Sequence, residues 1–221
     1  MQELALAGAA LIGATPRDVD AEGGGDLATV ARVLLDDGRE AIVKQSPAPA
    51  VEADMLDAIR ATGAPAPAVL GHDAGVLVLE LLPGGGNLGS AWHDLGAVMA
   101  RLHAARGDYF GWPKDYAFGP VGIDNATAAD WAVFWAERRL ANQTPHLPPA
   151  LAARVERLAG QLSDRLPALP PPALLHGDLW SGNIVVDRAR VSGLIDPACY
   201  YGHAEVDFAM LSLFGQPGPA L

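Results

Sequence analysis

HGDLWSGN, at positions 176–183, is the densest cluster of polar residues in the chain, and Asp196 follows thirteen residues after Asn183. Between them, two short apolar runs at 184–186 and 191–195 flank a polar turn, a pattern typical of a small β-hairpin. A hairpin returns the chain to its starting point. Asp196 is therefore expected to lie beside Asp178 and Asn183, at one end of a single site.

This set of side chains is what phosphoryl transfer requires. Asp178 can accept the proton of an attacking hydroxyl, while Asn183 and Asp196 offer the hard oxygen ligands that Mg²⁺ prefers. A polar turn capped by Asp and Asn explains each residue taken singly. The spacing of the whole set favours the catalytic interpretation.

The N-terminal third of the sequence predicts strands around one helix. Strands are predicted at 29–34, 41–44 and 76–82, and a helix at 51–61. Lys44 at a strand end and Glu52 on the helix form the pair that holds the α- and β-phosphates of ATP in kinases, although a surface lysine and a solvated acid would look the same. The glycine turn that contains Gly24 and Gly25 can bring backbone amides close to phosphate, or can be simply a flexible loop.

A glycine-rich segment separates this region from a mainly helical one. We expect an N-terminal nucleotide-binding lobe over 1–82, a hinge at 83–86, and a helical C-terminal lobe over 87–221 that carries the hairpin. The predicted fold class is α+β. Apolar stripes predict three helices in the second lobe: one from Trp92, one starting near Trp131 with Thr127 as N-cap, and one over 151–166.

Composition limits the partners of this chain. The 221 residues are 50% hydrophobic, which is enough for a sizeable core, and 15 Lys and Arg against 26 Asp and Glu give a net charge of −11. Such an acidic chain is a poor candidate for binding nucleic acid. The apolar run near the N-terminus is too short to span a membrane. Cys199 is the single cysteine, so a reducing, cytoplasmic setting is expected.

The sequence resembles the fructosamine (ketosamine) kinase family, whose members have a bilobal, protein-kinase-like fold and are related to aminoglycoside and choline phosphotransferases. HGDLxxGN is shared across that superfamily, whereas Trp180 and the run DPACYYGH at 196–203 are similar to the ketosamine branch. Further similar segments are AIVK at 41–44, EADMLDAIRATG at 52–63 and FGWPKDYAFG at 110–119.

The resemblance implies ATP and Mg²⁺ as cofactors, and phosphorylation of the sugar part of fructosamine- or ribulosamine-type ketosamines, free or protein-linked, which promotes deglycation. By this resemblance Asp178 would be the catalytic base, and Asn183 and Asp196 would be the magnesium ligands. Lys44, held by Glu52, would contact the ATP phosphates. The backbone from Glu80 to Leu82 would contact adenine. Candidate substrate residues are Trp180, Tyr201 and His203. His176 is expected to support the catalytic loop by hydrogen bonds, and Asp207 to tie that loop to the following helix.

Two other functions remain open at this point. One is an aminoglycoside or other amino-sugar phosphotransferase. The other is a truncated, weakly active nucleotide-binding remnant, because the family normally continues with several helices beyond the position that corresponds to Leu221. On that expectation the C-terminal lobe is incomplete, with an exposed apolar patch and an open acceptor side.

Overall fold

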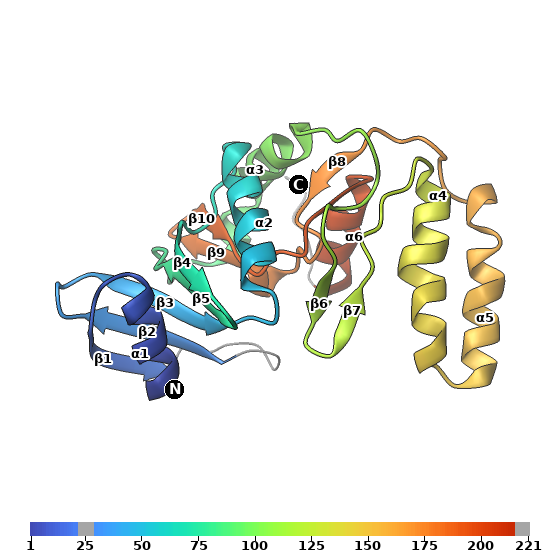
Figure 1. The fold of residues 1–221 in the computed structure, drawn as a ribbon. Helices are drawn as coiled ribbons and strands as arrows, with labels where there is room; N and C mark the ends of the chain where they lie inside the picture. The colour runs from blue at the N-terminus through green and yellow to red at the C-terminus, as the bar shows by residue number, and fades with distance from the viewer. Residues whose placement is uncertain (22–28, 215–221) are drawn as a thin grey trace.

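The computed structural model describes residues 1–21 and 29–214, and Figure 1 shows their arrangement. The N-terminal part is built on a five-stranded antiparallel sheet with the strand order β1-β2-β3-β5-β4. Its strands are β1 (Pro16–Ala21), β2 (Val30–Leu35), β3 (Glu40–Gln45), β4 (Val69–Asp73) and β5 (Val76–Glu80). Gly24 and Gly25 lie outside the described residues.

The three central strands confirm the sequence prediction, within one or two residues at their ends. Gly38, at φ +86°, makes the turn between β2 and β3, a conformation that glycine adopts without strain. The two edge strands were missed by sequence reasoning. β1 reads PRDVDA and β4 reads VLGHD, and neither has a fully buried residue, so neither shows the alternation that marks a half-buried strand.

Helices cover both faces of this sheet. In β5, Val78 packs in one buried cluster with Leu4, Ala5 and Ala9 of α1 (Gln2–Leu11), whereas Leu77 and Leu79 pack with α2 (Pro49–Ala61) in the other. Alternate residues of a strand point to opposite faces, so the apolar run in β5 is buried on both sides. Gly8 lets α1 lie close to β3, since a Cβ there would come within 2.4 Å of Val43 Cγ1.

The C-terminal part begins with α3 (Trp92–Ala104) and ends with α6 (Glu205–Phe214). Between them are α4 (Trp131–Phe134), α5 (Pro149–Ala159) and three small antiparallel pairs: β6 (Tyr116–Phe118) with β7 (Val121–Ile123), β8 (Ala173–Leu175) with β11 (Tyr200–Gly202), and β9 (Ile184–Asp187) with β10 (Arg190–Leu194). The predicted hairpin is therefore confirmed as β9–β10. The three-residue strands are too short to show a hydrophobic period, and sequence reasoning did not find them.

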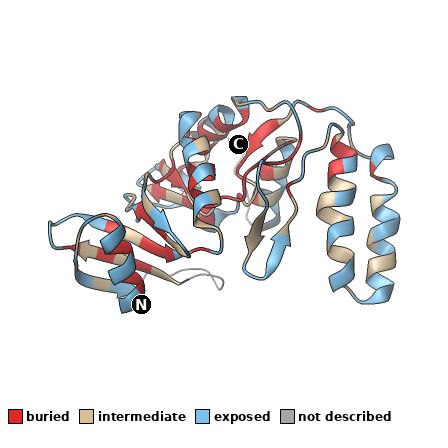
Figure 2. Ribbon diagram, viewed as in Figure 1, coloured by how far each residue is buried: buried red, intermediate tan, exposed pale blue. Residues whose placement is uncertain are grey.

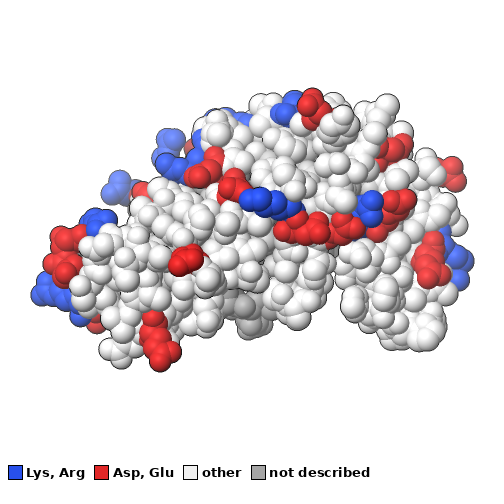
Figure 3. All heavy atoms as spheres, in the orientation of Figure 1, with Lys and Arg blue, Asp and Glu red and all other residues white. Residues whose placement is uncertain are grey.

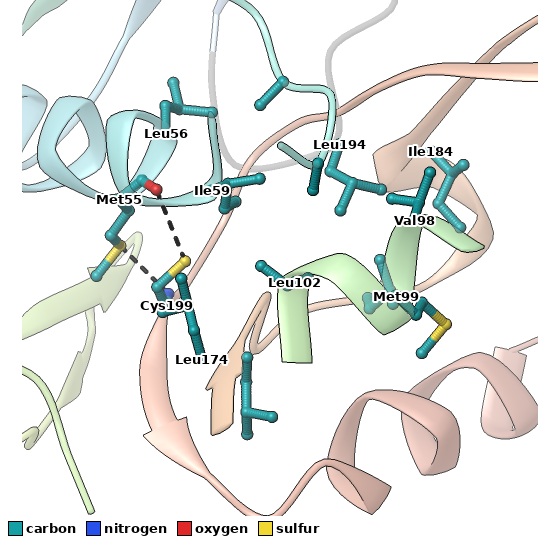
Figure 4. Packing of buried hydrophobic residues seen from close by; sticks show 14 of the residues in the cluster. Met55, Leu56, Ile59, Val98, Met99, Leu102, Leu174, Ile184, Leu194 and Cys199 are labelled. Atoms are coloured by element: carbon teal, nitrogen blue, oxygen red, sulfur yellow. Dashed lines mark hydrogen bonds between the residues drawn. The ribbon is translucent and has the colours of Figure 1, made fainter. Parts of the chain in front are cut away.

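One buried cluster continues from the N-terminal part into the C-terminal part. Figure 4 shows Met55 and Ile59 of α2 meeting Leu102 of α3, Leu174 of β8 and Leu194 of β10. In the same cluster the backbone amide of Cys199 contacts the Met55 sulfur at 3.3 Å, and burial raises the pKa of the Cys199 thiol, so this thiol stays protonated. The shared cluster fixes α2 relative to the loops on either side of β9–β10.

The glycine-rich segment after β5 is held against the β9–β10 hairpin. The amide of Gly86 donates to the Val186 carbonyl at 2.8 Å, and Ser192 Oγ donates to the Pro83 carbonyl at 2.5 Å. A Cβ at Gly86 would come within 2.7 Å of the Arg188 backbone nitrogen, so only glycine fits this approach.

The region from α4 to α5 corrects two sequence predictions. Asp130, not Thr127, is the N-cap of α4, because its carboxylate accepts from the Val133 amide at 2.9 Å. The helix continues as a π-helical stretch, Trp135–Leu140. The next helix, α5, ends at Ala159 rather than continuing to 166, and the apolar stripe continues only as the short 3-10 turn Leu162–Asp164.

Helix α4, through its π-helical continuation Trp135–Leu140, lies beside α5 at one end of the molecule, and much of the surface of α5 is exposed (Figures 1 and 2). No residue of α5 is buried, and Leu151 and Leu158 are 41% and 42% exposed. On the face drawn in Figure 3, acidic and basic side chains are interspersed without a broad basic area. Within residues 1–21 and 29–214, no helix has both the length and the apolar character needed to cross a membrane.

Replacing Leu102 by alanine should test the shared core. Leu102 is fully buried at the centre of this cluster, so Leu102→Ala should lower the free energy of unfolding by about 2–5 kcal/mol in urea denaturation. The matched control is Leu158→Ala on the exposed α5, which should change it by no more than about 0.5 kcal/mol. Equal losses for both variants would contradict this description of the core.

Candidate active site

The loop at 176–183 begins with a turn that only glycine can make. Gly177 has φ +80°, and a Cβ there would come within 2.1 Å of the Ala198 carbonyl oxygen. The close approach is also held by the Ala198 amide, which donates to the His176 carbonyl at 2.9 Å. The loop is thereby placed directly against the segment that follows Asp196.

Asp207, at the start of α6, holds the first two residues of the same loop through their backbone amides. Its completely buried carboxylate accepts from the amides of His176 and Gly177, each at 3.0 Å, and from Nε2 of His103 at 2.9 Å. The prediction that Asp207 ties the loop to the following helix is therefore confirmed. His103 takes part as a structural hydrogen-bond donor from α3.

His176 links the loop to the residue before Asp196. Its Nε2 lies 2.9 Å from the Ile195 carbonyl, and its Nδ1 accepts from the Asp178 amide at 3.3 Å. These contacts assign the proton to Nε2 of a neutral ring. Burial lowers the pKa of His176, although Asp207 and Asp178 oppose that shift. The expected supporting role of His176 is confirmed.

Asp178 and Asn183 form a hydrogen-bonded pair inside the loop. Asn183 Nδ2 donates to the Asp178 carboxylate at 3.0 Å and to the Asp178 carbonyl at 2.8 Å. Because the amide nitrogen makes these bonds, the side-chain oxygen of Asn183 is the atom that can coordinate a metal. Burial raises the pKa of Asp178, while His176 and Asn183 act in the opposite direction. The carboxylate is therefore more basic than an exposed aspartate.

Asp196 meets a buried lysine from the N-terminal sheet. Lys44 Nζ lies 2.5 Å from Asp196 Oδ1 and 2.8 Å from Glu52 Oε1. Burial alone would lower the pKa of Lys44, but the two carboxylates outweigh it and the pKa is raised, so the ammonium stays charged. Asp196 has φ +53°, a strained conformation for a residue other than glycine, and such strain is concentrated at functional sites.

Two further residues complete the surroundings of Glu52, and sequence reasoning assigned a role to neither. Ser46 Oγ donates to Glu52 Oε2 at 2.8 Å, and the Tyr116 hydroxyl donates to the same oxygen at 3.2 Å. Glu52 itself is completely buried. Tyr116 lies in the segment FGWPKDYAFG, and Ser46 lies two residues after Lys44. Neither position carries a signal of its own.

The donor set fits a magnesium ion that also binds phosphate oxygens. Across the described part of the chain, no group of three or more His, Cys, Asp or Glu side chains is arranged to hold a metal by itself. Mg²⁺ is commonly held by one or two protein oxygens together with substrate phosphates and water. The half-exposed carboxylate of Asp196 and the side-chain oxygen of Asn183 meet that need.

The three candidate substrate residues have different surroundings. Trp180 is 39% exposed, and its ring covers Gly182, where a Cβ would come within 2.3 Å of it. Tyr201 stacks on Trp112 at 5.9 Å between ring centroids and covers Gly107. His203 Nδ1 lies 3.5 Å from the carboxylate of Glu205. Of the three residues, only Trp180 is exposed, whereas Tyr201 and His203 are partly buried.

The candidate adenine contacts lie at the end of β5. The Glu80 amide donates to the Ala68 carbonyl at 2.9 Å, and its carboxylate accepts from the Ala68 amide at 3.0 Å. The Leu82 side chain lies against Gly193 of β10. A hollow of about 510 Å³ includes Glu80 and Arg60, but it contains none of Lys44, Asp178, Asn183 and Asp196.

Three features define a protein-kinase-like phosphotransferase fold. An antiparallel sheet carries Lys44, an irregular glycine-rich connection follows the sheet, and a helical part carries the Asp178 loop and Asp196. The family model "Fructosamine kinase" matches residues 21–221, and this chain belongs to that family.

Individual relatives agree with this assignment. The chain is 39% identical over 179 residues to a "Probable ketoamine kinase" of Synechocystis sp., a match that covers 74% of this chain and 59% of that protein. It is 34% identical over 142 residues to a chloroplastic protein-ribulosamine 3-kinase of Arabidopsis thaliana, covering 61% and 43%. The matches thus span about half the length of these curated relatives.

Solved structures share the fold. A structure from Thermobifida fusca that carries the name fructosamine-3-kinase superposes with a TM-score of 0.84 at 32% identity, over 98% of this chain and 80% of that one. An aminoglycoside phosphotransferase, APH(4)-Ia, solved with ADP and hygromycin B, gives a TM-score of 0.65 at 17% identity, over 89% and 72%. The latter similarity shows the fold alone.

Replacing His176 should change the pH dependence of stability. The pKa of His176 is lowered in the folded protein, so below about pH 6.5 the unfolded chain binds a proton that the folded chain does not. The free energy of unfolding should therefore fall as the pH decreases from 7 to 5. In His176→Gln this fall should be smaller, as measured by urea denaturation across that range.

The control for this experiment is the exposed His72. His72→Gln makes the same substitution at an exposed position, and it should leave the free energy of unfolding at pH 7 within about 0.5 kcal/mol of the unmodified protein. An unchanged dependence in His176→Gln would refute the assignment of a buried, neutral His176.

Proposed function

We propose that this chain transfers the γ-phosphoryl group of ATP to a sugar hydroxyl of a ketosamine of the fructosamine or ribulosamine type, a step that promotes deglycation. The observation that carries the proposal is the meeting of Lys44, Glu52 and Asp196 beside the Asp178–Asn183 pair, in a member of the fructosamine kinase family. The names of the Synechocystis and Arabidopsis relatives support this acceptor class.

Lys44 is proposed to hold the phosphates of the nucleotide. Its ammonium is charged and nearly buried, and Glu52 fixes it from the side of α2. A charge held in a partly dry site interacts more strongly with phosphate than an exposed lysine would. When phosphates bind, Lys44 would exchange part of its contact with Asp196 for contact with phosphate oxygens.

Asp178 is proposed to orient the acceptor hydroxyl and take its proton. The hydroxyl oxygen would form a bond to the γ-phosphorus while the bond from that phosphorus to the β,γ-bridging oxygen breaks, giving a phosphate monoester and ADP. Asn183 holds the Asp178 carboxylate in position through Nδ2. Mg²⁺, held by Asn183 and Asp196, would neutralise charge on the phosphates.

The rest of the nucleotide site is assigned to the N-terminal lobe. Glu80 to Leu82 would offer backbone groups to adenine, and the backbone amides of Gly24 and Gly25 would approach the phosphates. We place the lobes at 1–82 and 87–221, with 83–86 as the connection between them. The hydrogen bonds from this connection to β9–β10 support a fixed distance between the adenine and magnesium positions.

The acceptor is proposed to lie against Trp180, with Tyr201 and His203 nearby. An exposed indole ring can stack on the apolar face of a sugar, and this supports Trp180 in particular. The ketosamine can be free or attached to a protein. We propose a cytoplasmic enzyme without nucleic-acid or membrane partners.

An acceptor panel tests this function. The purified chain is incubated with Mg·ATP and either a fructosamine, a ribulosamine, an aminoglycoside or no acceptor, and ADP formation and phosphorylated product are measured. Acceptor-dependent turnover with a ketosamine is the expected result. If only the aminoglycoside supports turnover, the acceptor is an aminoglycoside and not a ketosamine. Absence of turnover with every acceptor would contradict a kinase function for this chain.

Removing the proposed base should slow phosphoryl transfer strongly while leaving nucleotide binding in place. Asp178→Asn should lower kcat by about 10²-fold or more, because a positioned acid–base group contributes at least that much. ATP affinity, measured by calorimetry, should stay close to that of the unmodified chain. Asp164→Asn, at an exposed position, is the matched control, and near-normal turnover in Asp178→Asn would exclude Asp178 from the mechanism.

Nucleotide binding should depend on a divalent metal through Asp196. Chelation of Mg²⁺ should weaken ATP binding in calorimetry, and Asp196→Asn should weaken Mg·ATP binding by roughly tenfold, which is ~1.4 kcal/mol. Asparagine is chosen because it tolerates the positive φ of this position. Equal ATP affinity with and without Mg²⁺ would refute the assignment of Asn183 and Asp196 as metal ligands.

A further inference from the structure

A short segment of the C-terminal part, Lys114–Tyr116, makes two side-chain contacts to helix α2 of the N-terminal part. The Tyr116 hydroxyl donates to Glu52 Oε2 at 3.2 Å, and Lys114 Nζ pairs with Asp54 Oδ2 at 2.8 Å. Figure 1 shows the β6–β7 hairpin, which starts at Tyr116, between the N-terminal sheet and the α4–α5 pair. Two contacts on one helix restrict its rotation more than either contact alone.

Glu52 needs these contacts because its carboxylate is completely buried. Oε1 accepts from Lys44, whereas Oε2 accepts from Ser46 and Tyr116. A buried carboxylate is stable only when donors satisfy both of its oxygens. Loss of the Tyr116 donor would leave one donor on each oxygen, and it would remove the only one of the three donors that comes from the C-terminal part, so the Glu52 side chain would be held less firmly against Lys44.

The Tyr116 hydroxyl keeps its proton under all ordinary conditions. Burial, and then the negative charge of Glu52, raise the pKa of Tyr116. The hydroxyl therefore acts as a permanent donor toward Glu52.

The segment is itself held firmly by Asn125, which is only 1% exposed. The Asn125 amide donates to Asp115 Oδ1 at 2.8 Å, Nδ2 donates to the Lys114 carbonyl at 3.1 Å, and Oδ1 accepts from Arg139 at 2.7 Å. The carbonyl of Asn125 accepts from the Trp112 amide at 3.0 Å. The C-terminal part thus determines where the segment, and with it the Tyr116 hydroxyl, lies.

We propose that Tyr116 is a positioning residue for phosphoryl transfer, which holds Glu52 and thereby the Lys44 ammonium in the place where nucleotide phosphates bind. The proposal rests on the proposed role of Lys44 in binding phosphate. It makes the Lys44–Glu52 pair dependent on a residue of the β6–β7 hairpin, 64 positions from Glu52. Alignment of Lys44 is then a property of both parts of the molecule.

The test is a double-mutant cycle between Tyr116→Phe and Glu52→Gln, with Tyr109→Phe as the matched control. Tyr116→Phe removes one oxygen atom and keeps the ring. Tyr109 is 58% exposed and lies between α3 and β6, close to Tyr116 along the chain. The Mg·ATP dissociation constant, measured by calorimetry, requires no acceptor, and thermal unfolding reports whether each variant is folded. With an accepted ketosamine, kcat and both KM values are measured as well.

Tyr116→Phe should weaken Mg·ATP binding by about five- to twentyfold, since it removes a hydrogen bond to a charged group. The KM for the acceptor should stay unchanged. In the Glu52→Gln background the same change should have an effect of less than about twofold, because Tyr116 acts through Glu52. Tyr109→Phe should match the unmodified protein in every measurement.

Three results would overturn the inference. If the unmodified chain binds no nucleotide, the proposed function fails and this inference fails with it. If it binds nucleotide and Tyr116→Phe binds equally well, this inference alone fails. If Tyr116→Phe weakens binding to the same extent with and without Glu52, then Tyr116 does not act through Glu52, and its assignment as a positioning residue is wrong.

Discussion

The ammonium of Lys44, buried between two carboxylates, is the interaction on which the rest of the site depends. Its partners come from helix α2 and from a residue 152 positions further along the chain. A buried charge is costly to leave unpaired, so the sheet, α2 and the loop at Asp196 must stay together for the folded state to be stable. The same requirement places a cation beside the residues proposed to hold magnesium.

A second buried charge organises the catalytic loop. Asp207 receives two backbone amides of the loop and a ring nitrogen of His103, and so connects α6, α3 and the HGD turn. His176 then connects this turn to Ile195. Through these bonds the proposed base and the proposed metal ligands keep a fixed relation, which is the main contribution a protein makes to phosphoryl transfer.

Much of the fold and of the candidate site could be predicted from the sequence, wherever the residues form a local pattern. Strands β2, β3 and β5 and helices α2 and α3 show clear hydrophobic periods, and the HGDLWSGN motif indicates the Asp178 loop. The edge strands β1 and β4 and the three-residue strands show no such period. Thr127 was a reasonable N-cap by residue type, but Asp130 is the residue whose carboxylate reaches the helix amides. The stripe at 151–166 predicted one helix, whereas α5 ends before Gly160.

The sequence by itself determined the family, the α+β class and the identity of the polar residues that gather at the site, because those depend on residue type and spacing along the chain. Tertiary structure alone decided that Ser46 and Tyr116 share one oxygen of Glu52, and that Asn125 holds the segment from which Tyr116 projects. Hydrogen bonds between residues tens of positions apart leave no periodic trace in a sequence. They exist only once the buried cluster shared by the two parts has brought α2, the β6–β7 hairpin and the loop at 176–183 together.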